Sequence, residues 1–380
     1  MHFVNDFRDP EKARGLINAI EAAIDPRRQY RFMEFCGGHT HVLSRWGLTE
    51  LLPANVKMIH GPGCPVCVLP VSRYVMAIDL ALKHKEVILC TYGDTMRVPT
   101  PKGLTLLTAR SQGADIRMVY SPADAVELAA QNLDREVVFL AIGFETTTPA
   151  TALAITAAKH RGLTNFSCLV SHVLTPAAMN HILSTAPARG AQPLSGIVGP
   201  AHVSTVIGSE AYRPVVQKYH IPLVIAGFEP LDMLAAILML IEQVNDNRAD
   251  VENEFTRAVT PEGNATAIAL MKEVFCVKEA FEWRGLGVVP DSALGLNPAY
   301  EAFDAQRKFA LIEQHVQENR ACACPAILRG EKDPEDCALF GKVCTPDRPI
   351  GACMVSSEGA CAARYRYAPR RARHDAQTQE

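Results

Sequence analysis

Seven short apolar runs, each ending in a turn that contains glycine, proline or histidine, constrain the fold of this chain most strongly. They are YRFMEFCGGHTH (30–41), VKMIHGPGCPVC (56–67), EVILCTYGD (86–94), EVVFLAIGFETTTP (136–149), FSCLVSHVLTP (166–176), SGIVGPAHVS (195–204) and IPLVIAGFEP (221–230). Helix-like segments lie between most of them, at 70–84, 122–132, 149–160, 176–185 and 231–247. This repeated succession of strand, turn and helix predicts an α/β fold with parallel sheets.

A weak internal repeat predicts two α/β domains of similar topology. The pair Gly61-Pro62 returns as Gly199-Pro200, 138 residues later (61 to 199), and the turns TYGD and GFEP follow the two pairs at comparable distances. We therefore expect one α/β domain at 30–132 and a second at 133–230. Residues 1–29 and 231–380 are expected to form a third, mainly helical portion, with helices near 9–25 and 301–317.

Charge and hydropathy exclude several classes of protein. The net charge of −3 over 380 residues is not that of a general nucleic-acid or membrane-surface binder. The first residues, MHFVNDFRDPEKARG, lack the apolar core of a signal peptide. The most apolar helical stretch, LDMLAAILMLIEQV, is too short to span a bilayer. We expect a cytoplasmic protein with no nucleic-acid or membrane partner.

Twelve cysteines are many for a chain of this kind. In a reducing compartment they are poor candidates for structural disulfides, which favours metal or redox chemistry. Six lie between Cys322 and Cys361, and three others lie in glycine-rich turns. Cys168 and Cys276 are embedded in apolar sequence and are expected to be small buried side chains.

Four of the turns carry the residues suited to chemistry, and parallel strands bring such turns to one edge of a sheet. CGGHTH offers Cys36 as a soft ligand for iron or zinc, and His39 as a ligand, a base or a partner of the Cys36 thiolate. GPGCPVC places Cys64 and Cys67 at the spacing of a redox dithiol, on a glycine-proline turn that we expect to keep both thiols accessible. A structural zinc site, in which Cys36 and His39 complete Cys3His, is the competing interpretation, and a turn without function is the third. TYGDTMRVP and GFETTTP suit either an anion site or helix caps.

The C-terminal region gives the strongest signal. Cys324, Cys337, Cys344 and Cys361 are separated by 12, 6 and 16 residues. Four thiolates hold either an iron–sulfur cluster or zinc, and the spacing alone leaves the metal open. Cys322 and Cys353 fall outside this array.

Together these motifs resemble the HypD family of [NiFe]-hydrogenase maturation proteins. CGGHTH, GPGCPVC, TYGDTMRVP, GFETTTP and the C-x12-C-x6-C-x16-C array occur in order from residue 36 to 361. The resemblance implies two similar α/β domains and a mainly helical portion that holds a [4Fe–4S] cluster. It further implies a scaffold on which iron receives two cyanides and one carbon monoxide, with redox capacity. The implied partners are a HypC-like chaperone, a HypE-like cyanide donor and, through HypC, the hydrogenase large subunit.

The resemblance also assigns roles to residues. Cys36 is the implied ligand of the iron under assembly, Cys64 and Cys67 are the redox dithiol at the same iron, and Cys324, Cys337, Cys344 and Cys361 are the cluster ligands. Two other hypotheses compete with this one. An iron–sulfur-dependent thiol–disulfide reductase needs only the cluster and the dithiol and leaves CGGHTH unexplained. A zinc-stabilised interaction module leaves the α/β turns without a role.

Overall fold

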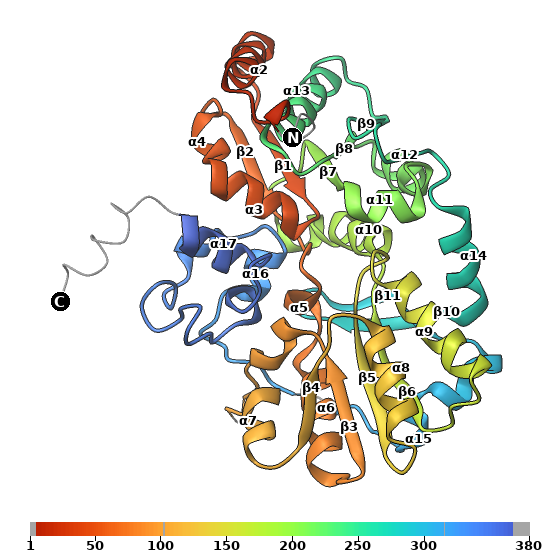
Figure 1. Cartoon of the computed structure of the whole chain (residues 1–380). Coiled ribbons are helices and arrows are strands. Elements are labelled where there is room, and N and C mark those ends of the chain that lie inside the picture. The colour runs from red at the N-terminus through yellow and green to blue at the C-terminus, as the bar shows by residue number, and fades with distance from the viewer. Residues whose placement is uncertain (1–4, 102, 315, 368–380) are drawn as a thin grey trace.

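The computed structural model describes residues 5–101, 103–314 and 316–367. Two parallel sheets form the two main bodies of the molecule, and the C-terminal cysteine-rich segment lies at their junction (Figure 1). The α/β fold with two parallel-sheet domains is therefore confirmed. Among the described residues, no helix is long and apolar enough to cross a membrane.

The first sheet has five parallel strands in the order β2-β1-β7-β8-β9. Their bounds are Val56–His60, Tyr30–Glu34, Gly196–Pro200, Leu223–Ala226 and Val251–Asn253. One face packs against α2 (Pro10–Ala23), α3 (Gly37–Trp46) and α13 (Pro230–Asn245), and α4 (Leu48–Leu51) follows α3. The other face packs against α10 (Thr175–Thr185), α11 (Ala201–Ile207) and α12 (Arg213–Tyr219), with short 3₁₀ turns at Pro187–Arg189 and Glu210–Tyr212.

The second sheet has four parallel strands in the order β4-β3-β5-β6. Their bounds are Asp115–Met118, Val87–Thr91, Glu136–Gly143 and Phe166–His172. Helices α6 (Val71–Lys83) and α7 (Leu106–Ser111) cover one face, and α8 (Pro122–Gln131) and α9 (Thr148–His160) cover the other. The helices expected at 70–84, 122–132, 149–160, 176–185 and 231–247 are thus confirmed to within two residues.

The predicted contiguous domains, 30–132 and 133–230, do not coincide with the two sheets. Strands β1 and β2 pair with β7 and β8, whereas β3 and β4 pair with β5. The chain therefore crosses between the bodies after β2 and again after β6. A repeat of turns along the sequence cannot distinguish these pairings, because the turns look alike in both arrangements.

The remaining portion is less helical than expected. Helix α2 is confirmed: the Asp9 side chain caps it by accepting from the backbone N–H groups of Glu11 and Lys12. However, after α14 (Ala265–Val274) the chain forms an antiparallel hairpin, β10 (Phe275–Trp283) and β11 (Gly287–Leu296). The helix expected at 301–317 is reduced to the 3₁₀ turn Pro298–Phe303 and the four-residue α15 (Ala305–Lys308). It ends there because Ala310 adopts a left-handed conformation, with φ of 47°.

Both sheets reverse their strand order where functional turns emerge. In the first sheet the reversal lies between β1 and β7, and in the second between β3 and β5. Ligands of parallel α/β sheets bind beyond the carboxyl ends of strands at such points. CGGHTH follows β1, and TYGDTMRVP and GFETTTP follow β3 and β5, so three of the four turns begin at a reversal, whereas GPGCPVC follows the edge strand β2.

Candidate metal and thiol site

Cys36 lies two residues after the end of β1 and forms the N-cap of α3. Its side chain is half-buried, with backbone N–H groups of Gly38 and His39 directed at the sulfur. Burial first, and then the charges of Glu358 and Glu34, raise the pKa of the Cys36 thiol above its ordinary value. The thiol is therefore protonated at neutral pH, and a metal ion must displace that proton in order to bind.

Glu34, the last residue of β1, holds this turn in place and was missed by sequence reasoning. Its side chain is fully buried, and Oε2 accepts from the backbone N–H of Cys36 at 2.9 Å. Its other oxygen contacts the Thr40 hydroxyl and lies 3.1 Å from Nδ1 of His60, at the end of β2. The available signal was an acidic residue, two positions before Cys36, at the end of a strand whose only other charged residue is Arg31.

The CGGHTH and GPGCPVC turns contact each other through their backbones. The N–H of Gly37 donates to the carbonyl of Gly63 at 3.1 Å. A Cβ added to Gly63 would lie 2.4–2.6 Å from the backbone N, Cα and C of Cys36. Glycine is required there because any side chain would push the two turns apart.

We expect Gly63→Ala to displace Cys36 from the dithiol turn and to lower the free energy of unfolding by about 1–3 kcal/mol, as other overpacking substitutions do. Urea denaturation measures this change. Gly15→Ala is the matched control, since Gly15 is exposed in α2 with nothing within 4 Å of the added Cβ. The control should be neutral or stabilising, because alanine favours a helix. Equal stability of the two variants would contradict the proposed contact.

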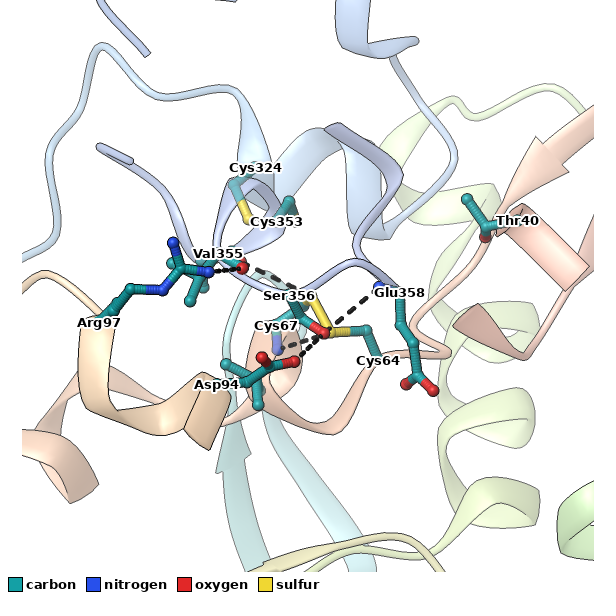
Figure 2. The surroundings of a disulfide bond; sticks show 12 residues. Thr40, Cys64, Cys67, Asp94, Arg97, Cys324, Cys353, Val355, Ser356 and Glu358 are labelled. Carbon is teal, nitrogen blue, oxygen red and sulfur yellow. Dashed lines mark hydrogen bonds between the residues drawn. A yellow bond between two sulfur atoms is a disulfide. The ribbon is translucent and has the colours of Figure 1, made fainter. Parts of the chain in front are cut away.

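Cys64 and Cys67 form a disulfide, with a Cα–Cα distance of 5.2 Å. Cys64 caps the four-residue α5 (Pro65–Val68), and its sulfur accepts from the N–H of Cys67 at 3.2 Å. We expected the turn to leave this pair accessible, and that expectation is wrong: Cys64 is 3% exposed and Cys67 is 0% exposed. The cause is a covering segment, residues 352–358, which lies over the disulfide (Figure 2).

The TYGDTMRVP turn fastens this covering segment. Oδ2 of Asp94 accepts from the Ser356 hydroxyl at 2.6 Å, and Nη2 of Arg97 donates to the Val355 carbonyl at 2.9 Å, beside the disulfide (Figure 2). The next residues of the segment reach the Cys36 turn, because a Cβ on Gly37 would meet Glu358 at 2.3 Å. Three of the four predicted turns therefore come together around residues 352–358.

The fourth turn, GFETTTP, faces the interior instead. Glu145 is 2% exposed and accepts from the N–H and the hydroxyl of Thr175, each at 2.8 Å. It thereby holds the N-terminus of α10, and burial raises the pKa of Glu145 to about 7. The hydroxyl of Thr148 is bonded to the carbonyl of Phe144. Glu145 therefore caps α10, whereas Thr147, the N-cap residue of α9, makes no side-chain capping hydrogen bond.

His39 is fully buried in α3 rather than open to the cleft. Its Nε2 donates to the Ala226 carbonyl at 2.9 Å, and its ring stacks on Phe228 with a centroid distance of 5.0 Å. Burial lowers the pKa of His39, which favours the neutral ring. In that tautomer Nδ1 is an acceptor, and it has no hydrogen-bond partner among the described residues. His39 thus fixes α3, and with it Cys36, against β8.

The six C-terminal cysteines line one cavity together with Phe340, Gly351 and Met354; they are Cys322, Cys324, Cys337, Cys344, Cys353 and Cys361. Three of them lie in short elements: Cys324 in α16 (Cys324–Leu328), Cys353 in the 3₁₀ turn Ala352–Met354 and Cys361 in α17 (Ala360–Tyr367). Cys337 follows the 3₁₀ turn Pro334–Asp336, and Cys322 and Cys344 lie in loops. The sulfurs of Cys324 and Cys353 lie 2.6 Å apart. The cavity adjoins the dithiol, since Sγ of Cys67 is 3.8 Å from the Ala352 carbonyl.

The donor set of this cavity suits an iron–sulfur cluster. Its polar lining is almost entirely sulfur, which is the ligand chemistry of such clusters. Two backbone N–H groups, of Ile350 and Gly351, point at the Cys344 sulfur, and hydrogen bonds of this kind tune cluster potentials. Within the described part of the chain, no three His, Cys, Asp or Glu side chains are gathered closely enough to hold a single metal ion.

Comparison with known proteins identifies the family. The HypD family model, described as "Hydrogenase formation hypA family", matches residues 11–368. The chain belongs to the HypD family. It is 61% identical over 372 residues to the hydrogenase expression/formation protein HupD of Azotobacter chroococcum mcd 1, covering 98% of each chain. It is 60% identical to the hydrogenase maturation factor HypD of Azotobacter vinelandii, again over 98% of each chain.

A more distant HypD shows how far the similarity extends. The hydrogenase maturation factor HypD of Escherichia coli K12 is 45% identical over 375 residues, covering 97% of this chain and 98% of its own. The similarity spans both sheets and the cysteine-rich segment. The resemblance noted from five short motifs is thus confirmed over nearly the whole chain. Its function is therefore to be sought in hydrogenase maturation, the role named for these relatives.

Proposed function

We propose that this chain is a scaffold and redox protein in the cytoplasmic assembly of the Fe(CN)2CO unit of [NiFe]-hydrogenase. In this proposal it acts together with a HypC-like chaperone, accepts cyanide from a HypE-like donor, and passes the iron unit to the hydrogenase large subunit through the HypC-like protein. The observation that carries the proposal is the contiguity of three sulfur groups. The half-buried Cys36 abuts the turn of the Cys64–Cys67 disulfide, and that disulfide abuts the cysteine-lined cavity.

Each group has a distinct task in this proposal. Cys36 is a soft ligand for the iron substrate, and a HypC-like cysteine would supply a second. Reduction of the Cys64–Cys67 disulfide would release two further thiols at the same iron. Cys324, Cys337, Cys344 and Cys361 would hold a [4Fe–4S] cluster, which supplies electrons one at a time. Carbon monoxide and cyanide favour low-spin Fe(II). The reduced Cys64–Cys67 dithiol would store two electrons beside the iron, with which the iron is brought to that state and kept there.

The chain's own residues prepare this site. Glu34 and His39 hold the Cys36 turn in place through hydrogen bonds, and the covering segment, residues 352–358, keeps water from the disulfide. The proton displaced from Cys36 lies beside the Glu358 carboxylate, which is exposed at the surface. A protein-disulfide reductase is the alternative function. The burial of both Cys64 and Cys67 disfavours it, because a reductase must bring its dithiol to a sulfur of another protein.

Infrared spectroscopy tests the proposal directly. The chain is co-expressed with a HypC-like partner in cells that supply cyanide, and the complex is purified without oxygen. We expect stretching bands of iron-bound cyanide and carbon monoxide. A complex that holds iron but lacks these bands, from cells that mature hydrogenase normally, would contradict the scaffold role.

A further inference from the structure

Two of the six cysteines around the cavity are not needed as permanent ligands of a four-thiolate cluster, and they differ in position. Cys353 is 1% exposed and lies deep beside Cys324. Cys322 is half-buried, whereas the four proposed ligands are buried, at 2–8% exposure. Cys322 lines the same cavity as Cys324, and a Cβ built on Gly351 would lie 2.4 Å from Sγ of Cys322 and 3.4 Å from Cβ of Cys324. Cys322 is therefore the outermost sulfur of a contiguous group.

Cys322 also borders a separate, solvent-open cleft of about 390 Å³. Prolines 99, 101 and 349 form part of its wall, and Arg284, Gln317, Glu318 and Asn319 supply polar groups. Cys322 and Gly351 line both this cleft and the cysteine cavity. A Cβ on Gly351 would lie 2.4 Å from the Cys322 sulfur, so the sulfur rests against bare backbone at the opening between the two spaces.

We propose that Cys322 is a receiving ligand. It makes the first bond to an iron–sulfur cluster that is delivered through this cleft, and then passes the cluster iron to Cys324. The inference rests on the proposed cluster and adds a route by which that cluster is loaded. The two residues are separated only by Ala323 and line the same cavity. Cys322 contacts the cleft, whereas Cys324 lines only the inner cavity.

The transfer is a pair of ligand exchanges without change of oxidation state. The Cys322 thiol gives its proton to the departing thiolate of the donor as its sulfur bonds to iron. The Cys324 thiol then forms its bond to the same iron, and its proton goes to the departing Cys322 sulfur. Cys322 is thereby returned as a free thiol, and no oxidant or reductant is consumed.

The test is anaerobic incubation of the full chain with a preformed [4Fe–4S] cluster that carries small thiolate ligands, followed by visible absorption over time and by the final iron and sulfide content. Cys322→Ala should reach the wild-type content but load about tenfold or more slowly, the scale of loss seen when groups supporting a metal site are removed. Cys276→Ala is the matched control, because Cys276 is an exposed thiol on β10 outside both spaces. It should load at the wild-type rate.

Alkylation gives a second readout that does not depend on a variant. Brief maleimide treatment before loading should modify Cys322 ahead of the five inner cysteines and slow loading to the rate of Cys322→Ala. A Cys322→Ala chain that loads at the wild-type rate overturns the proposal. A Cys322→Ala chain with reduced final content also overturns it, because Cys322 would then be a permanent ligand. If the wild-type chain takes up no iron–sulfur cluster, both the cluster assignment and this proposal are wrong.

Discussion

Cys36→Ala should remove the cyanide and carbon monoxide bands from the complex with a HypC-like partner while leaving the C-terminal cluster unchanged. Alanine offers no soft donor for iron, and a HypC-like cysteine alone would hold the metal weakly. The fold should tolerate the change, since a half-buried sulfur is lost and the backbone N–H of residue 36 can still donate to Glu34. We expect the infrared bands to fall below detection.

Two measurements separate this loss from general damage. Visible absorption and iron content should show the cluster at the wild-type level, and thiol titration after denaturation should still detect the Cys64–Cys67 disulfide. Cys276→Ala controls for removal of a thiol as such. Full infrared bands in Cys36→Ala, together with normal hydrogenase maturation in cells, would exclude Cys36 from the site.

The second large effect is expected at the four proposed cluster ligands. Replacing Cys324, Cys337, Cys344 or Cys361 by Ala should reduce the bound iron and sulfide to a small fraction of the wild-type value. Ligand bonds to a metal contribute folding free energy, so residues 322–367 should also become sensitive to protease. Cys361 is the most informative position, because α17, which carries it, packs against α3 beside Cys36.

The two remaining cysteines supply the comparison. Cys353→Ala and Cys322→Ala should both retain the cluster at equilibrium, although the Cys353 sulfur contacts that of Cys324. Loss of the cluster in Cys353→Ala, with retention in any of the four ligand variants, would show that the set of four is wrongly chosen. Iron and sulfide analysis of anaerobically purified variants decides between these outcomes.

The sequence predicted the elements of the fold better than their pairing. Strand β5 and helix α13 were evident because apolar periodicity and caps are local properties. Membership of a sheet depends on contacts between distant residues, so the pairing of β1 with β7 could not be predicted from a repeat of turns. The hairpin β10–β11 was missed, and Cys276, which we expected to be buried, is exposed on it.

In the candidate site, too, residues with a local sequence signal were predicted, and features that depend on distant contacts were not. Cys36, Cys64 and Cys67 were found from residue type and spacing, and the structure brings their turns into contact. Glu34 and Glu358 were missed, because a single carboxylate in a strand or a turn is not distinctive until its neighbours are known. Burial of the disulfide was also missed, since the covering residues lie about 285 positions further along the chain.

That cover has a consequence for selectivity among reductants. Glutathione and other thiols of a cell reduce a disulfide by attacking one sulfur along the S–S axis, and both sulfurs here are shielded by the segment that Asp94 and Arg97 fasten. Electrons, unlike thiols, need no physical approach, and the 3.8 Å contact between Sγ of Cys67 and the Ala352 carbonyl would give them a short path from a cluster in the cysteine-lined cavity. In the proposed function the segment would therefore insulate the dithiol from the bulk thiol pool, so that its oxidation state would follow the iron–sulfur cluster rather than the surrounding solution.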